Sequence, residues 1–166
     1  MPVYDMPLSV AGIDAVIREL ESFRDRLNDA SERVVRELAH DAENDMSARL
    51  SSVADPDGNV DARVQSNVSG NEATVSLTGS QAAFLEFGTG VVGRTSPHEM
   101  AGRVGWNYAS GAKIRSFKNG RIGWVYFDQS RRHYRVTSGI AAQNIVIGAS
   151  ATTRTMIARR IREALR

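Results

Sequence analysis

Glu86 is the first residue of this sequence whose chemistry stands out, because it is a carboxylate inside an apolar run. Residues 82–87 read Ala-Ala-Phe-Leu-Glu-Phe and are followed by the turn Gly88-Thr89-Gly90. A carboxylate in such a run needs hydrogen bonds or a positive partner. The glycines leave the N–H groups of the turn accessible, and Thr89 adds a hydroxyl. We predict a fixed corner in which local N–H groups bind Glu86, with a salt bridge between subunits as the alternative; its residues are Phe84, Glu86, Phe87, Gly88, Thr89 and Gly90.

The histidines give little support to catalysis or metal binding. His40, His98 and His133 are far apart, and no two have the spacing of metal ligands. His98-Glu99 is the one pair that resembles an acid-base couple, so a hydrolase centred on it is a remote alternative. The chain has no cysteine, which excludes disulfides, thiolate zinc sites and a cysteine nucleophile. We expect no enzymatic activity, no metal and no cofactor.

The run Gly88-Thr89-Gly90-Val91-Val92-Gly93 matches the dinucleotide-binding pattern GxGxxG. The pattern has physical meaning only between a strand and a helix whose N-terminus faces the pyrophosphate. Residues 94–97 read Arg-Thr-Ser-Pro, which is poor material for a helix, and no acidic residue lies about 20 positions further on. We therefore do not expect nucleotide binding.

Charge divides the chain into two parts. Residues 1–61 hold fourteen Asp and Glu against six Arg, a net charge of −8, whereas residues 62–166 hold fifteen Lys and Arg against five acids, a net charge of +10. A solvated acidic helix beside a basic sheet is the simplest interpretation. The alternative is that the acidic face of residues 14–45 meets the basic side of the adjacent subunit, which is the kind of contact that closes rings.

Hydrophobic periodicity predicts the elements that position these residues. Apolar residues recur every three or four positions from Ile13 to Leu50, so we predict one long amphipathic helix, with a possible break near residues 28–31 and a start at Ser9 or Gly12. Such a helix would be about 60 Å long and suggests an arm that contacts a neighbour.

The rest of the chain predicts a sheet and a closing helix. Residues 62–68 and 73–77 form one predicted hairpin, and residues 113–117 and 122–127 form another around Asn119-Gly120. We predict a short helix at 80–87, a long loop at 91–111, a possible strand at 145–147 and a helix at 152–165. The fold class is α+β with an antiparallel or mixed sheet, as a single domain 1–166 with a helical arm (1–54), a sheet region (55–148) and a C-terminal helix (149–166). No apolar run is long enough to cross a membrane, and the N-terminus lacks a secretory pattern.

The corner segment resembles the Glu-Phe-Gly-Thr signature of the tail-completion or neck proteins of long-tailed bacteriophages, a family that includes head-tail joining and minor tail proteins. Two further segments are similar: Gly12-Ile13-Asp14 before the long helix, and residues 123–128 with 137–144, which resemble a tryptophan hairpin and the segment after it. Residues 55–60 echo only part of a Pro-x-Asp-Thr-Gly-x-Leu motif, and Asn144-Ile145 replaces a Pro-Phe pair.

The resemblance implies a structural virion protein that forms a ring, completes or terminates the tail, and joins it to the head connector, with DNA passing through the lumen. Because tail tubes of this kind are six-fold, it implies a hexamer, found in the virion neck and in the host cytoplasm during assembly. Its partners would be head connector or adaptor proteins and tail-tube or terminator proteins. We expect contacts with partner rings from Arg94, His98, Arg103, Trp106, Lys113, Arg115, Lys118 and Arg121, and contacts with subunits or DNA from Arg131, Arg132, Arg135, Arg159 and Arg162.

The main rival interpretation is a DNA-binding module that does not read sequence. Basic residues alternate with aromatic ones between residues 113 and 135. Such a surface could hold a phosphate backbone, using this hairpin and the C-terminal helix. We favour a structural interpretation, in which the aromatic side chains of the hairpin pack inward and its charges face water or an acidic neighbour.

Overall fold

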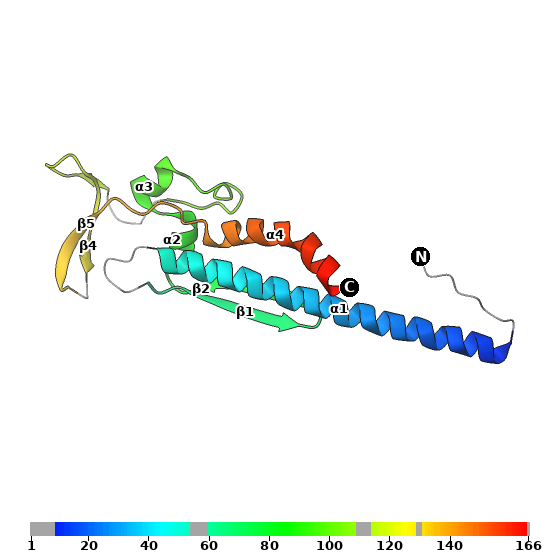
Figure 1. The fold of residues 1–166 in the computed structure, drawn as a ribbon. Helices are drawn as coiled ribbons and strands as arrows, with labels where there is room; N and C mark the ends of the chain where they lie inside the picture. Colours follow the sequence, from blue (N-terminus) through cyan, green and yellow to red (C-terminus); the bar gives the residue numbers. More distant parts are fainter. Residues whose placement is uncertain (1–8, 54–59, 109–113, 129–130, 166) are drawn as a thin grey trace.

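A computed structural model describes residues 9–53, 60–108, 114–128 and 131–165, the side chain of Asp128 excepted. The described elements have an α+β arrangement, as predicted, with a long N-terminal helix, two small antiparallel sheets and a C-terminal helix (Figure 1). In chain order they are α1 (Val10–Ser52), β1 (Arg63–Ser69), β2 (Glu72–Thr78), α2 (Ala82–Phe87), α3 (Gly90–Thr95), β3 (Arg115–Ser116), β4 (Ile122–Asp128), β5 (His133–Thr137) and α4 (Ile145–Ala164).

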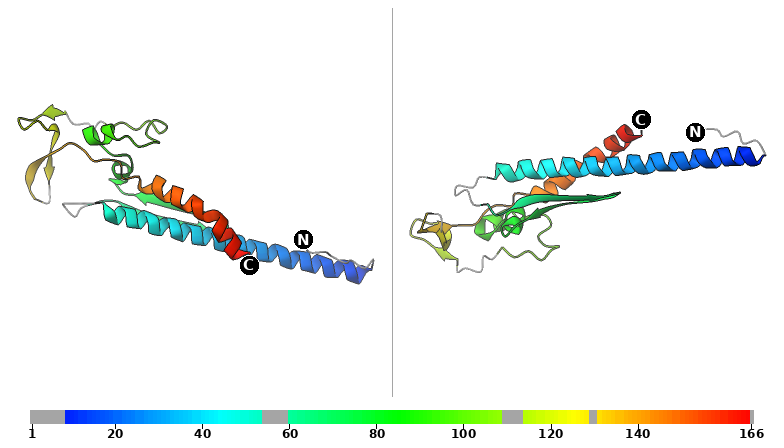
Figure 2. Two further views of the ribbon diagram at one scale, coloured as in Figure 1. Left: turned by 45° about the horizontal axis from the view of Figure 1, so that its top comes forward. Right: turned by 90° about the horizontal axis from the view of Figure 1, so that it is seen from below.

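Helix α1 is continuous over 43 residues, so the possible break at residues 28–31 is absent. Ser9 caps its start, since the side-chain Oγ accepts a hydrogen bond from Gly12 N at 3.2 Å. At 1.5 Å per residue the helix is about 65 Å long. Figure 2 shows that α4 and the β1–β2 hairpin lie along its C-terminal part, whereas its N-terminal part extends beyond both. The N-terminal part of α1 thus projects from the rest of the described structure.

A small hydrophobic core forms where α1, α2, α4 and the β1–β2 hairpin meet. Its fully buried members come from three helices, and the partly buried residues that surround them come mainly from the hairpin and the end of α1. The first predicted hairpin is confirmed, with Asn67 opposite Thr74 in the antiparallel register. The core residues are Met46, Leu85, Ile145 and Ala149, surrounded by Leu50, Val53, Val60, Ala62, Val64, Val75 and Leu77.

Arg160 of α4 ties this helix to the acidic side of α1. Its guanidinium binds both carboxylate oxygens of Asp41, at 2.7 to 2.9 Å, and lies 3.3 Å from Glu37. The hydrogen bonds with Asp41 raise the pKa of Arg160 above its already high ordinary value, so the guanidinium stays charged. Part of the charge complementarity that the sequence suggests between subunits is thus satisfied within one subunit.

The second sheet lies at the far end of the molecule from the N-terminus of α1 (Figure 1). Its strand order is β3-β4-β5, all antiparallel. The predicted Asn119-Gly120 hairpin is confirmed between β3 and β4, but the expectation of one sheet is wrong, because β1 and β2 form a separate two-stranded sheet. Strand β5 was not predicted; Tyr134 and Val136 alternate there with polar residues over only five positions. We call β3–β5 the distal sheet.

Two further predictions are corrected at the ends of helices. The region predicted as a loop from residue 91 begins with a helical turn, α3, which ends at Thr95 just before Pro97. The stretch Ile145-Val146-Ile147 is the first turn of α4 rather than a strand, so the C-terminal helix begins at Ile145 instead of 149 or 152. Glu86 accepts hydrogen bonds from the N–H groups of Val146 and Ile147, which stabilises this turn as a helix.

Asp61 closes the base of the β1–β2 hairpin and should make stability depend on acid pH. It accepts hydrogen bonds from Ser80 Oγ at 2.6 Å and Ser80 N at 3.0 Å, and these bonds lower its pKa below the ordinary aspartate value. A lowered pKa stabilises the folded state above about pH 4, and this contribution disappears as the pH falls through the folded-state pKa. Asp61→Asn should lower stability at pH 7 and flatten its decline below pH 4, as measured by urea unfolding at several pH values. An unchanged acid profile would contradict the role of Asp61.

Candidate functional site

The carboxylate of Glu86 caps the N-terminus of α4 from a distance of sixty residues along the chain. Its two oxygens accept hydrogen bonds from Val146 N at 2.8 Å and Ile147 N at 3.1 Å. These are the second and third helical positions, which an N-cap side chain normally binds. The residue at the cap position, Asn144, has a left-handed backbone and makes no side-chain cap bond. Glu86 therefore supplies both the missing cap and a negative charge at the positive end of the helix.

His98 is the third partner of this carboxylate. Its Nε2 lies 3.1 Å from Glu86 Oε1, and its Nδ1 accepts a hydrogen bond from Met100 N at 3.1 Å. Because Nδ1 acts as an acceptor, the proton of the neutral ring is on Nε2 and is donated to Glu86. The side chains of His98 and Glu86 are only 1% and 8% exposed. The partner of His98 is thus Glu86 rather than the adjacent Glu99, which is exposed.

This geometry corrects two expectations. The N–H groups that bind Glu86 belong to α4 and not to the turn that follows Glu86. The alternative was a salt bridge to another subunit, but the side chain that Glu86 contacts is the buried His98 of the same chain. His98 itself was expected to contact a partner ring, but its side chain is enclosed within the subunit. A carboxylate is costly to bury, and three donors from two separate segments offset that cost here.

Three aromatic rings cover this buried pair. Phe87 meets the His98 ring edge-on with centroids 4.6 Å apart, and Trp106 stacks on Phe87 at 5.1 Å. Phe84 contacts Trp106 edge-on at 5.8 Å. The indole N–H of Trp106 also donates to Gly88 O at 3.1 Å. Trp106, which was expected to contact a partner ring, is half-buried and holds the corner in place.

The glycine turn joins the corner to the segment that follows β5. Thr89 N donates to Ile140 O at 2.8 Å, and Thr89 Oγ1 accepts from Ile140 N at 3.3 Å. Gly88 has φ +77°, and a Cβ there would lie 2.7 Å from Ala142 N. At Gly90, with φ +65°, a Cβ would lie 2.5 Å from a ring carbon of Trp124 in β4. The turn thus needs glycine both for its backbone angles and for close approach of other segments.

The corner therefore connects four parts of the molecule: α2, the loop that carries His98 and Trp106, the distal sheet and α4. An open cleft of about 790 Å³ lies beside it, lined by Glu86, His98, Met100, Arg103 and Arg154 among others. The acceptor and donor atoms of Glu86 and His98 are occupied by each other and by backbone amides. What this arrangement can do is fix the orientation of the distal sheet relative to α4. The glycine-rich run follows a helix, α2, and not the strand that dinucleotide binding requires.

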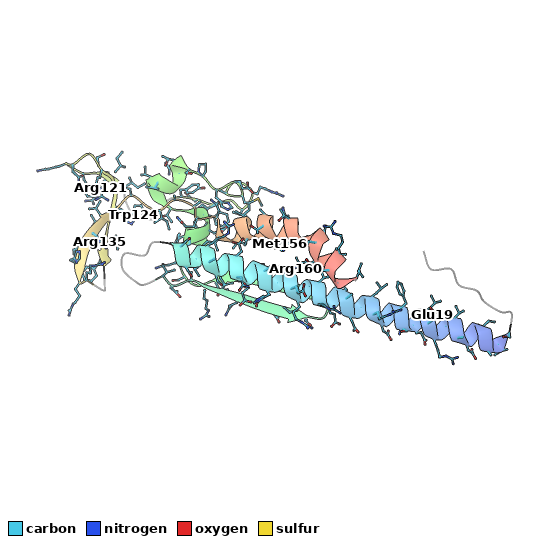
Figure 3. The ribbon with its side chains drawn as sticks, in the orientation of Figure 1. Glu19, Arg121, Trp124, Arg135, Met156 and Arg160 are labelled. Carbon is cyan, nitrogen blue, oxygen red and sulfur yellow. The ribbon has the colours of Figure 1, made fainter. Side chains whose placement is uncertain are left out.

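The distal sheet presents apolar and aromatic side chains to solvent. Tyr134 is 73% exposed and meets the exposed Phe127 edge-on, with centroids 5.2 Å apart on directly opposite residues of β5 and β4. Val125 and Tyr126 are exposed as well. The expectation that the aromatics of this hairpin pack inward is therefore wrong for Tyr126, Phe127 and Tyr134, whereas Phe117 and Trp124 are half-buried; Figure 3 labels Trp124 at the base of the sheet. These exposed apolar and aromatic side chains form an uncovered patch on β4 and β5.

Basic side chains share this end of the molecule. Arg121 donates to Val136 O at 3.4 Å across the sheet, and Arg135 is opposite Tyr126 in the register. Figure 3 shows Arg121, Trp124 and Arg135 together here. Of the other predicted contact residues, Arg94 and Arg103 lie near the corner, Arg159 and Arg162 are exposed on α4, and Lys113 lies outside the described residues. Arg115, Lys118, Arg131 and Arg132 are exposed on the distal sheet or its turns.

Sequence reasoning missed the residues that bind the corner from afar. Val146 and Ile147 contribute through their main-chain N–H groups, and Ile140 through its peptide group, so their side chains carry no signal. Tyr108 is also part of the site, since its hydroxyl accepts from His98 N at 3.0 Å and its carbonyl oxygen accepts from Gly90 N. Asn144 is itself a favoured N-cap residue, so its type did not indicate that α4 is capped from elsewhere.

Across the described ranges, no three His, Asp or Glu side chains are grouped so as to hold a metal ion, and no helix has the length and apolar character to span a membrane. No family model matches the chain, and no curated protein or solved structure matches it either.

Proposed function

We propose that this chain is a structural virion protein of the neck of a tailed phage, forming a ring that completes or terminates the tail and joins it to the head connector, with DNA passing through the lumen. The observation that carries the proposal is how much apolar surface one subunit leaves uncovered. Among the described residues, twenty large hydrophobic side chains are exposed, whereas eight hydrophobic residues are buried. A protein built this way is completed by partners.

The location of this surface supports assembly rather than catalysis. Eleven of the twenty uncovered side chains lie on the N-terminal part of α1 or on β4 and β5 of the distal sheet, at opposite ends of the elongated molecule (Figure 1). Two separate contact regions allow each subunit to touch more than one neighbour, as a ring stacked between other rings requires. The corner at Glu86 gives the distal sheet a fixed direction. We propose a hexamer, with the head connector on one side and the tail tube or terminator on the other.

Native mass spectrometry and negative-stain electron microscopy of the full chain test ring formation. We expect a discrete multi-subunit mass and annular particles. The double variant Phe127→Ser/Tyr134→Ser should abolish the rings, with little change in Tm because both side chains are exposed. The control is Val68→Ser, which changes an exposed hydrophobic residue of β1 away from the distal sheet and should leave the rings intact. A wild-type chain that stays a single subunit at every concentration would contradict the proposal.

The second candidate is a DNA-binding module, and exposed Tyr134 beside Phe127 on an arginine-rich sheet is the observation that favours it. Aromatic rings on a basic surface are a platform on which bases stack. Binding of duplex and single-stranded DNA to the isolated chain should then weaken about a thousandfold between 50 and 200 mM salt. Arg132→Ala should reduce both the affinity and the salt slope. A ring protein that only encloses DNA should show neither effect in its free form.

A further inference from the structure

The N-terminal part of α1 carries an apolar stripe that no described element of the subunit covers. Its exposed members are between 42% and 78% accessible, although they recur along one side of a helix. Figure 3 places Glu19 on this projecting segment, well beyond the end of α4. We propose that this stripe pairs, in antiparallel orientation, with the same stripe of a second copy of the chain. We call the exposed residues Val10, Ile13, Ile17, Leu20, Phe23 and Leu27 the arm stripe.

The spacing within the arm is that of a coiled-coil seam. Ile13, Leu20 and Leu27 are seven residues apart, and Val16, Phe23 and Ala30 follow each of them by three. These are the a and d positions of a heptad repeat, at which side chains of one helix insert between those of a facing helix. Ile17 widens the stripe at an e position. The pattern therefore indicates another helix as the occupant of this face.

The same seam is already a packing face further along α1. Ala30 is buried, and Val34, the next a position, is half-buried. Both line an apolar groove of about 290 Å³ with Ile161 and Leu165 at the end of α4. Helix α4 thus covers the seam from Ala30 toward the C-terminus of α1. The arm stripe continues the same seam toward the N-terminus of α1. No described helix covers residues 10–27, and a helix that did so would end at the groove.

An antiparallel second copy meets this requirement. In such a pair a positions face d positions: Leu20 faces Phe23 of the second copy, Val16 faces Leu27, and Ile13 faces Ala30. The N-terminal end of the second helix, which starts at Val10, then reaches the groove beside Ala30. In a parallel pair, Ala30 of one copy would instead face Ala30 of the other. Each copy already has its own α4 beside Ala30, so the groove would stay open.

Charge on the flanks of the seam fits the same arrangement. Glu19 and Arg26 both occupy g positions, and in the antiparallel register Glu19 of each copy lies opposite Arg26 of the other. Two attractive pairs thus flank the central Leu20–Phe23 layers, one on each side of the two-fold axis. This complementarity favours a second copy of this chain over an unrelated apolar helix.

The inference does not depend on the proposed function, and it adds a contact of a different symmetry. Neighbours in a cyclic ring contact each other head to tail, through two different surfaces. The antiparallel arm pair has a two-fold axis and uses the same surface of both copies. The arm pair therefore belongs to the unassembled protein.

The absence of cysteine from the chain allows a direct test by disulfide cross-linking of the full-length protein. Val16→Cys and Leu27→Cys are made as separate proteins, and Arg18→Cys, on the outer face of the same helix, is the control. On oxidation, a mixture of the first two should form a 16–27 cross-link at least about tenfold faster than either forms a homodimer, and faster than the control. Each variant should keep the wild-type helical signal, because neither Val16 nor Leu27 is buried in the described structure.

Rapid homodimers of Val16→Cys alone and Leu27→Cys alone would show a parallel pair and overturn the proposal. A mixture that cross-links no faster than Arg18→Cys would overturn the arm stripe as a contact between copies. The variant Leu20→Asp should convert the dimer to monomer in sedimentation equilibrium, and an unchanged mass would count against the proposal. Rings that form without any arm cross-link would leave the proposed function standing while this inference fails.

Discussion

Glu86→Gln is expected to lower the free energy of unfolding by about 2 to 4 kcal/mol. Three donors surround the Glu86 carboxylate: Val146 N, Ile147 N and His98 Nε2. A glutamine of the same shape keeps one acceptor oxygen and turns an NH₂ group toward these donors, so at least one buried N–H loses its partner. It also removes the negative charge at the N-terminus of α4. Urea unfolding, or a Tm about 5 to 12 °C lower, measures the effect.

The matched control is Glu99→Gln, the same substitution on an exposed side chain thirteen residues away. It should change stability by less than about 0.5 kcal/mol. Equal stability of the two variants would show that Glu86 is not the cap of α4. His98→Gln should have an intermediate effect, because it removes one of the three donors to the carboxylate and leaves both α4 amides in place.

Gly88→Ala should be the most disruptive single-methyl change in the corner. The residue has φ +77° and ψ 170°, a region open almost only to glycine. A Cβ there would also lie 2.7 Å from Ala142 N and 2.8 Å from Ile140 O, both of which are backbone atoms that cannot rotate away. We expect a loss of about 3 kcal/mol or more, and a loss of ring formation, because the segment leading to the distal sheet must move.

Gly120→Ala is the control for a positive φ without a close approach. Gly120 has the same φ, +77°, but nothing lies within 4 Å of the position of its Cβ. Its substitution should cost only about 1 kcal/mol and leave assembly unchanged. If both variants are destabilised equally, the close approach of residues 140–142 to Gly88 does not contribute. Urea unfolding and native mass spectrometry of the pair provide the comparison.

The elements that could be predicted from the sequence are those with a regular repeat of hydrophobic residues or with residues typical of a turn. The 3.6-residue pattern of α1 and the turns at Gly70 and Asn119-Gly120 are local, and the long helix and both hairpins were predicted from them. The first turn of α4 was predicted as a strand because Ile145-Val146-Ile147 is β-branched and apolar. Its helical state depends on Glu86, which no local pattern connects to it.

The candidate site likewise has features that could be predicted from the sequence and features that could not. A buried carboxylate beside a glycine turn could be predicted from residues 82–90, and Glu86 and Gly88 do form a corner. Which groups bind the carboxylate could not be predicted, since they are main-chain N–H groups and a histidine from another loop. The exposure of Phe127 and Tyr134 was also not predictable, because alternation in a strand does not show whether its apolar face has a partner within the subunit.

Purified phage particles provide the most direct test of the proposed function. Mass spectrometry of the particles, together with electron microscopy of particles labelled with an antibody against this chain, would report both its presence and its position. The account predicts that the chain is present in several copies per particle and that the label lies at the junction of head and tail. A chain that is absent from the particles, or one that is labelled only away from this junction, would contradict the account.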